Sequence, residues 1–175
     1  MEYTLNIKGK LLDLKEPQVM GILNVTPDSF FAGSRKQTEQ EIAQRTNEIV
    51  EQGGTMIDVG AYSTRPGAEE VTAEEEMRRL RMALAIVRHE QPDVPLSVDT
   101  FRADVARMVV EEFGADIIND VGEGCDKDMF RMVARLHVPY ILMSVQKDLH
   151  DTLMVFAQKV QMLRDLGQKD IILLL

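Results

Sequence analysis

Several features are scarce in this sequence of 175 residues, and each shortage excludes a class of protein. Cys125 is the single cysteine, so the chain can form no intrachain disulfide and no thiolate zinc cluster, which fits a reducing compartment. No stretch approaches the roughly 18 consecutive apolar residues of a membrane span, and the first ten residues lack the apolar core of a signal peptide. We therefore expect a soluble, cytoplasmic protein.

Basic residues are also in deficit, because 20 Lys and Arg face 29 Asp and Glu, giving a net charge of −9. Nucleic acids and anionic membranes repel such a chain, so neither is an expected partner. An anionic substrate would need local help from arginines, a helix N-terminus or a metal ion. Neither GxGxxG nor GxxxxGK[ST] follows the first buried strand, which weighs against the usual nucleotide-binding folds.

The chain does contain a repeating unit of apolar runs separated by helical patterns, with 45% hydrophobic residues to build a core. Six short runs each predict a buried strand: VMGILN, MIDVG, PLSVDT, ADIIND, VPYILM and DIILLL. Five helices fit between them, and parallel strands need such crossovers. We expect one α/β domain over residues 1–175 with a hairpin in residues 1–16; open doubly wound sheets and closed barrels both have this rhythm.

Two capping boxes and one apolar face predict details of the helices. Thr38 with Glu41, and Thr72 with Glu75, each have the spacing of a helix start. The last helix is predicted to bury one face, formed by Leu153, Phe156, Val160 and Leu163.

Polar residues stand at or near the ends of the predicted strands: Asn24, Asp58, Asp99 and Asn119. Taken singly, several could serve local structure. Asn24 could belong to the turn NVTPDS, Thr100 or Asp99 could cap the helix beginning near Phe101, and Asn119 with Asp120 could act as a cap after the fourth strand. Taken together they converge on one rim, where ligand sites lie in parallel α/β folds. Because an unpaired buried polar group costs about 1–3 kcal/mol, we expect a ligand or a network to satisfy them.

The loop YSTRPGAEEV is a second candidate for binding. Arg65 lies between Thr64 and Pro66, on a turn stiffened by proline and suited to presenting a guanidinium to an anion. The alternative is that Arg65 pairs with the acidic run of residues 69–76, which otherwise begins a solvated helix.

Five ordered stretches together resemble dihydropteroate synthase: GILNVTPDSF, GAYSTRPGAEEV, SVDTFRADVA, ADIINDV and VPYILM. The resemblance covers nearly the whole chain and implies a (β/α)8 TIM barrel, with about six strands and five helices present here. It also implies a transferase of folate biosynthesis. Such an enzyme joins 4-aminobenzoate to (7,8-dihydropterin-6-yl)methyl diphosphate, releases pyrophosphate and uses Mg²⁺. The family is usually dimeric and is the target of sulfonamides, so a homo-oligomer is possible.

The resemblance also implies a role for each matching residue. Asn24 would hold the Mg²⁺ that binds the diphosphate, as a hard oxygen donor suits that ion. Asp99 and Asn119 would hydrogen-bond the pterin ring, and Met143 would pack against it. Two loops would close over the leaving group and shape the aminobenzoate slot, the first with Asp28 and Phe30, the second with Thr64, Arg65 and Pro66. Asp99 and Arg65 are the candidate catalytic residues.

Some positions depart from the family pattern. Residues 31–34 alter the tip of the first loop, and Ser144 stands where a histidine often follows the methionine. Leu174 and Leu175 occupy the places of an Asp-Pro pair whose Asp binds pterin, and a later Lys-bearing loop and Arg-x-His segment have no counterpart. We therefore expect a chain truncated after the sixth strand, with little or no turnover.

Two alternatives remain open. One is a non-catalytic truncated or engineered homologue that folds or assembles without turnover. The other is a pterin-binding protein like the methyltetrahydrofolate:corrinoid methyltransferases, although NVTPDSF and STRPG suit a diphosphate that methyl transfer does not use.

Overall fold

The computed structural model describes residues 3–26, 35–62 and 71–175, and within these ranges it contains every strand predicted from the sequence. In chain order the elements are β1 (Thr4–Ile7), β2 (Lys10–Asp13), β3 (Met20–Asn24), α2 (Arg35–Glu51), β4 (Met56–Gly60), α3 (Ala73–Glu90), β5 (Leu96–Asp99), α4 (Ala103–Phe113), β6 (Ile117–Asp120), α5 (Met129–Leu136), β7 (Tyr140–Met143), α6 (Leu149–Asp165) and β8 (Ile171–Leu174).

The main sheet is entirely parallel and follows the chain, in the order β3-β4-β5-β6-β7-β8, with a helix between each pair of neighbours. This is the arrangement expected of consecutive βα units, because each crossover returns the chain to the same end of the sheet. Among the described residues β3 and β8 each pair with one strand, so the sheet has two edges.

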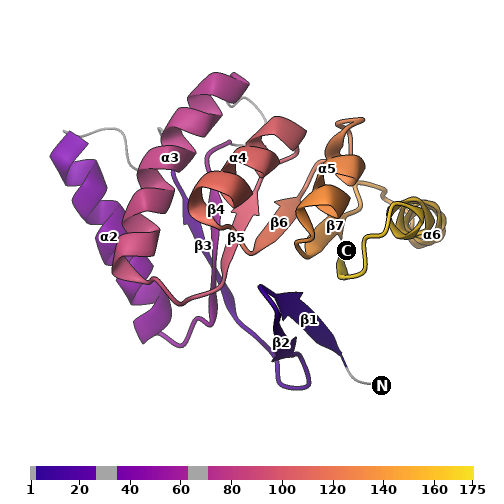
Figure 1. Cartoon of the computed structure of the whole chain (residues 1–175), viewed down its shortest axis with the longest axis horizontal. Helices are drawn as coiled ribbons and strands as arrows, with labels where there is room; N and C mark the ends of the chain where they lie inside the picture. The colour runs from indigo at the N-terminus through magenta and orange to yellow at the C-terminus, as the bar shows by residue number, and fades with distance from the viewer. Residues whose placement is uncertain (1–2, 27–34, 63–70) are drawn as a thin grey trace.

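The two faces of the sheet differ in what they pack against. Alternate residues such as Leu23, Val59, Val98, Ile118 and Leu142 point to the face that the helices cover, and they are completely or almost completely buried there. Figure 1 shows the described helices, α2 to α6, along this outer side of the sheet.

The inner face carries a small apolar cluster near the amino ends of the strands. Met56, Ile117 and Ile141 form it, and Ile7 and Leu12 of the β1–β2 hairpin pack against it. The hairpin is antiparallel, as predicted, and Figure 1 shows it below the strands, at the end opposite to their carboxyl termini. One end of the inner face is therefore closed by apolar packing, which leaves the other end for polar groups.

A buried carboxylate fixes the hairpin to the sheet. Asp116, just before β6, is 4% exposed; its Oδ1 lies 2.8 Å from Lys8 Nζ and its Oδ2 lies 2.9 Å from Arg88 Nη2. The Leu96 amide donates to the same Oδ2. Lys8 and Gly9 form the hairpin turn with positive φ values of 49° and 82°.

Two helix predictions were wrong in detail and one was confirmed. Thr72 caps α3 as predicted, accepting from the Glu75 amide at 3.3 Å. Thr38, however, lies inside α2, which begins three residues earlier at Arg35, and its side chain is buried rather than capping. Leu153 is 57% exposed, because the buried face of α6 is formed by Thr152, Phe156 and Leu163.

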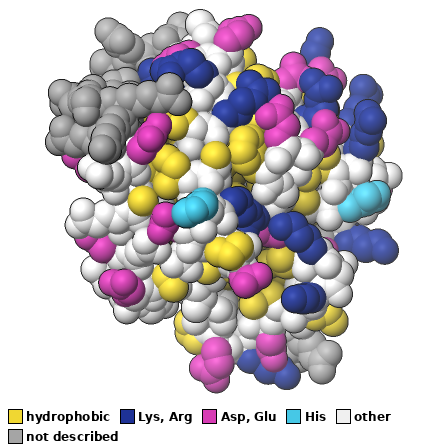
Figure 2. Space-filling view, turned by 60° about the vertical axis from the view of Figure 1, so that its left-hand side comes forward, with side chains coloured by type: hydrophobic (Ala, Val, Ile, Leu, Met, Phe, Trp, Pro, Cys, Tyr) yellow, Lys and Arg dark blue, Asp and Glu magenta, His cyan; other side chains and the backbone are white. Residues whose placement is uncertain are grey.

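The surface over α2 and α3 fits the acidic composition. Figure 2 shows acidic and basic side chains interspersed over the side that carries α2 and α3. Between α3 and α4 they form pairs such as Arg81 with Glu112, 2.7 Å apart. In the part of the chain that the structure describes, none of the helices has the length and apolar character needed to cross a bilayer.

Candidate active site

The strand register places the predicted polar residues in one row across the carboxyl ends of four strands. Asn24 on β3 lies opposite Gly60 on β4, Gly60 lies opposite Asp99 on β5, and Asp99 lies opposite Asn119 on β6. All four residues have the parity of the inner face. The prediction that these strand ends converge is therefore confirmed for Asn24, Asp99 and Asn119.

Gly60 is the small residue that lets its two neighbours approach one another. A Cβ atom at this position would lie 3.2 Å from Asn24 Oδ1 and 3.4 Å from Asp99 Oδ2. A side chain there would press on both oxygens, whereas glycine leaves space between them. Two hard oxygen groups therefore flank an open position in the middle of the row.

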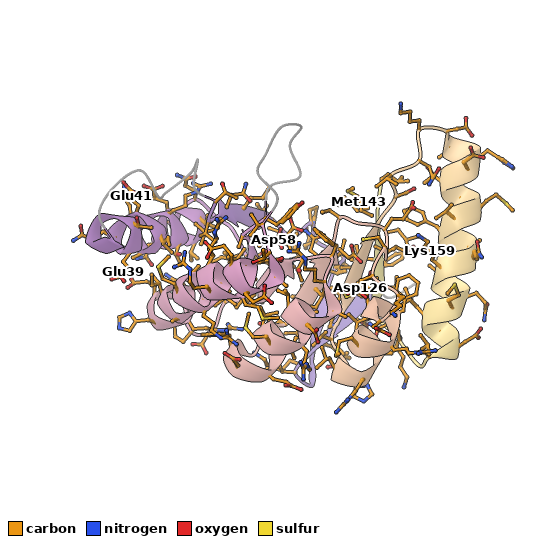
Figure 3. All side chains as sticks on the ribbon, turned by 90° about the horizontal axis from the view of Figure 1, so that it is seen from above. Glu39, Glu41, Asp58, Asp126, Met143 and Lys159 are labelled. Atoms are coloured by element: carbon orange, nitrogen blue, oxygen red, sulfur yellow. The ribbon has the colours of Figure 1, made fainter. Side chains whose placement is uncertain are left out.

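Asp58 lies one step below the row, on the same inner face, and faces Asn119 across β5. Asn119 Nδ2 donates to Asp58 Oδ2 at 3.0 Å, and Figure 3 shows Asp58 in the middle of the structure. Burial raises the pKa of Asp58, while the neighbouring Ser97 hydroxyl and Asn119 amide favour the charged form.

Three buried oxygens at this end of the inner face have no hydrogen-bond partner within 3.5 Å among the described residues: Asp58 Oδ1, Ser97 Oγ and Asn119 Oδ1. The Ser97 hydroxyl lies opposite Asp58 in the register and close enough to lower its pKa, so Asn119 Oδ1 is the oxygen with the clearest need of a ligand. Such groups are unusual in a folded protein, because each loses its hydration without a replacement. They are the observation that points to a polar ligand with N–H groups at the end of the inner face.

The surroundings of Asp99 raise its pKa. Burial raises its pKa, and the nearby carboxylates of Asp58, Glu76 and Asp120 raise it further, to about 7. A carboxyl group with a pKa near neutrality can accept a proton or hold one, so it suits proton handling or hydrogen bonding to a ligand.

A network beside Asp99 includes the fully buried Glu76. The Thr100 hydroxyl donates to Glu76 Oε1 at 2.7 Å, and Arg102 Nη1 pairs with Glu76 Oε2. Arg102 also donates to the Val71 carbonyl at 2.7 Å and stacks over the Tyr62 ring, 5.1 Å from its centroid. Arg102 thus compensates the buried charge of Glu76 and ties together residues that flank the site.

The local roles considered for Asp99, Asn119 and Asp120 are taken by other groups. Helix α4 begins at Ala103, whose amide donates at 2.8 Å to Asp126 Oδ2, a carboxylate from the next loop. Asp120 does not cap α5 but accepts from the amides of Gly122 and Gly124 at 2.7 and 3.0 Å. In the part of the chain that the structure describes, neither Asp99 nor Asn119 therefore caps a helix.

Met143 ends β7 and lies on the inner face, half-buried, opposite Leu174 of β8. Leu174 is 41% exposed, so the strand end next to Met143 is apolar, in the place where the family pattern has an aspartate. The polar row accordingly stops at Asn119, and the rim continues as an apolar patch.

Five predicted site residues lie outside the described ranges: Asp28, Phe30, Thr64, Arg65 and Pro66. The acidic run that was the alternative partner of Arg65 has arginines of its own among the described residues. Glu75 pairs with Arg78 and Arg79, and Glu76 pairs with Arg102. Arg65, Glu69 and Glu70 lie outside the described residues, so both readings of Arg65, as an anion ligand and as a partner of the acidic run, stay predictions.

Sequence reasoning missed several groups that shape the site. We did not predict Gly60, Glu76 or Arg102 from the sequence. Gly60 could have been found, because it stands two residues after Asp58 in the strand and so shares its face. Partial burial raises the pKa of the Cys125 thiol, which lowers its thiolate content.

The donor set fits a weakly held hard cation better than a protein-built metal cage. Among the described residues no three acidic, histidine or cysteine side chains gather closely enough to hold a metal ion. Asn24 offers one carboxamide oxygen beside the open position at Gly60. Magnesium takes most of its ligands from water and substrate phosphates, so a single protein oxygen is compatible with it.

Comparisons with known proteins agree with this geometry. A family model described as "Pterin binding enzyme" matches residues 20–166. A curated dihydropteroate synthase of Streptococcus pyogenes is 40% identical over 141 residues, which are 80% of this chain and 52% of that protein.

The structure of Xanthomonas albilineans dihydropteroate synthase with 4-aminobenzoic acid superposes with a TM-score of 0.89 at 32% identity, covering 99% of this chain and 66% of that one. The same enzyme in complex with 7,8-dihydropteroate gives a TM-score of 0.82 at 30% identity, covering 98% and 64%. The chain thus spans about half of the curated relative and about two thirds of the solved structures. It has the TIM-barrel type of fold over six strands and five helices, and it belongs to the pterin-binding enzyme family, with dihydropteroate synthases as its relatives.

Proposed function

We propose that this chain carries the pterin end of a dihydropteroate synthase site. In the reaction the amine of 4-aminobenzoate attacks the methylene carbon of (7,8-dihydropterin-6-yl)methyl diphosphate. The C–O bond to the diphosphate breaks, pyrophosphate leaves and the amine loses a proton. The relatives with pteroate and aminobenzoate in their structures support this substrate class.

The pterin is assigned to the inner face, because its ring edge carries the complementary groups. Asp58 and Asp99 would accept from ring N–H and amino groups, while Asn119 would accept through its unpartnered Oδ1. These contacts would replace lost hydration at each buried oxygen. Met143 would cover the flat ring from the end of β7, and Asp99, titrating near neutrality, would hold or release a proton at the ring.

The diphosphate is assigned to the side of the row where Asn24 lies. Asn24 would be the protein ligand of Mg²⁺, and the ion, when bound, would neutralise the charge that develops on the departing pyrophosphate. Arg65 would add a guanidinium, with Thr64 and Pro66 beside it and Asp28 and Phe30 in the first loop. This explains how an acidic chain would handle two anionic substrates.

The observation that carries the proposal is the group of buried oxygens without a hydrogen-bond partner among the described residues: Asn119 Oδ1 within the row of strand ends, and Asp58 Oδ1 and Ser97 Oγ directly beneath it. The test is pyrophosphate release by the 175-residue chain with dihydropterin diphosphate, 4-aminobenzoate and magnesium. We expect binding of the pterin and little turnover, with both abolished in Asp99→Ala. A folded chain that neither binds pterin nor turns over would contradict the proposal.

A second candidate is pterin binding without turnover. Its support is that about a third of each solved relative has no counterpart in this chain, and residues of that third could complete the site. Pterin binding without pyrophosphate release would favour it. We place either activity in the cytoplasm, with a homo-oligomer as the assembly to look for.

A further inference from the structure

Glu123 lies in the loop between β6 and α5 with φ of +58°, in the left-handed region that a residue with a side chain seldom adopts. Its side chain is 12% exposed. Such a conformation costs of order 1 kcal/mol and persists only where neighbouring contacts determine it. The surroundings of Glu123 show which contacts do so.

Asp120 builds the loop that presents Glu123. Its two carboxylate oxygens accept from the amides on either side of Glu123, Gly122 at 2.7 Å and Gly124 at 3.0 Å. The Tyr140 hydroxyl of the neighbouring strand donates to the same carboxylate. The turn is therefore anchored to β6 and β7, and the Glu123 side chain points to the segment that follows β7.

The two oxygens of the Glu123 carboxylate have different main partners, and Gln146 Nε2 lies 3.5 Å from Oε1 and 3.4 Å from Oε2. Oε1 accepts from Ser144 Oγ at 3.0 Å and from the Val145 amide at 3.1 Å. Oε2 lies 3.3 Å from Lys159 Nζ of α6, and Lys159 also donates to the Glu123 carbonyl. Figure 3 shows Lys159 on the side of α6 that faces the rest of the chain, near Met143.

From these contacts we propose that Glu123 is a positioning residue that fixes Ser144 and Val145, and through them Met143, against the bound pterin. This deepens the proposed function and rests on it for the identity of the ligand. Ser144 stands where the family pattern often has a histidine, so the hydrogen bond from Ser144 Oγ to Glu123 depends on the serine of this chain.

The division between the two oxygens allows a sharp test on the full 175-residue chain. Glu123→Ala removes both sets of contacts. Glu123→Gln combined with Lys159→Met keeps an acceptor for Ser144 and Val145 and removes the ion pair together with the hydrogen bond from Lys159 to the Glu123 carbonyl. Glu111→Ala, at an exposed glutamate on α4, is the matched control. Ser144→Ala removes the hydroxyl that donates to Glu123 and so tests the same contact at its donor.

Two readouts separate this inference from the function on which it rests. In the ligand-free protein, the Val145 amide exchange rate and the Met143 methyl resonance report the position of the segment. Affinity for 6-hydroxymethylpterin, with the ring-current shift of the Met143 methyl, reports its consequence for binding.

In Glu123→Ala we expect faster Val145 exchange, a moved Met143 resonance and affinity about tenfold weaker, as expected from losing about 1.4 kcal/mol of hydrogen bonding. Ser144→Ala should give a smaller change of the same kind. The Gln/Met double variant and Glu111→Ala should stay within about twofold of the original chain.

A Glu123→Ala protein whose Val145 exchange and Met143 resonance match the original chain would overturn the inference. So would a double variant as impaired as Glu123→Ala, because the ion pair would then be the important contact. If the unaltered chain bound no pterin while the ligand-free signals changed as expected, the proposed function would fail and the positioning role would stand.

Discussion

At the residue scale, Gly60 controls the distance between Asn24 and Asp99. In Gly60→Ala the new Cβ would meet Asn24 Oδ1 at 3.2 Å, so the Asn24 side chain must shift by a few tenths of an ångström, and it would be in van der Waals contact with Asp99 Oδ2 at 3.4 Å. We expect affinity for the pterin diphosphate to fall about tenfold while the thermal midpoint changes by a few degrees. Titration calorimetry with parallel thermal denaturation measures both; unchanged affinity in a folded variant would contradict this account.

Also at this scale, Asp99 should make the protein less stable as the pH rises. Its folded pKa of about 7 lies above the ordinary aspartate value of 3.8, so the folded state binds the proton more tightly than the unfolded chain does. The contribution is fully present below about pH 4 and is lost as the pH passes 7, a change of up to about 4 kcal/mol.

Urea unfolding of Asp99→Asn at pH 5 and pH 8.5 checks this prediction. At the higher pH the free energy of unfolding of the variant should be larger than that of the original chain. A smaller dependence of stability on pH should remain, because burial also raises the pKa values of Asp58 and Asp120. Asp93→Asn, at an exposed aspartate before β5, is the control and should keep the full slope. Equal slopes in the two variants would show that Asp99 is not the group responsible.

At the scale of elements, the start of α4 depends on a carboxylate from another loop. Asp126 accepts from the Ala103 amide and lies at the positive end of the helix dipole. Asp126→Ala should lower the free energy of unfolding by about 1 kcal/mol, and Asp126→Asn, which keeps an acceptor, by less. Asp128→Ala is the comparison, since Asp128 precedes α5 without a side-chain cap bond. Denaturant unfolding gives all three values; an equal loss in the Asp128 variant would remove the capping explanation.

At the scale of the whole molecule, the two sheet edges leave apolar side chains in water. Ile22 on β3 is 58% exposed, and Leu173 and Leu174 on β8 are 47% and 41% exposed. Strand edges of this kind pair readily with further strands. About a third of the Xanthomonas albilineans enzyme has no counterpart in this chain, and a segment from that third is the occupant that we expect at these edges.

We therefore expect that segment, added as a separate polypeptide, to form a 1:1 complex with the chain and to slow amide exchange in β3 and β8. Size-exclusion chromatography and hydrogen exchange test this, with the β1–β2 hairpin as an internal reference that should not change. Failure to associate, or slowing confined to the hairpin, would contradict it.

The sequence by itself determined the order and type of the elements, because the spacing of apolar residues and the turn residues between them are local patterns that can be recognised without knowing the fold. It also located Asn24, Asp99 and Asn119 at strand ends, because parallel strands bring their carboxyl ends to one rim. Tertiary structure decided what those residues touch. Asp126 takes the capping role considered for Asp99, Thr38 lies inside α2 and Leu153 faces water.

The same holds for Glu76 with Arg102 and for Glu123 with Ser144, which meet from different loops. Contacts between segments 20 or more residues apart depend on register, sheet curvature and burial together. The surroundings of a charged group therefore form only when the chain folds, and so does the environment that raises the pKa of Asp99 to near neutrality.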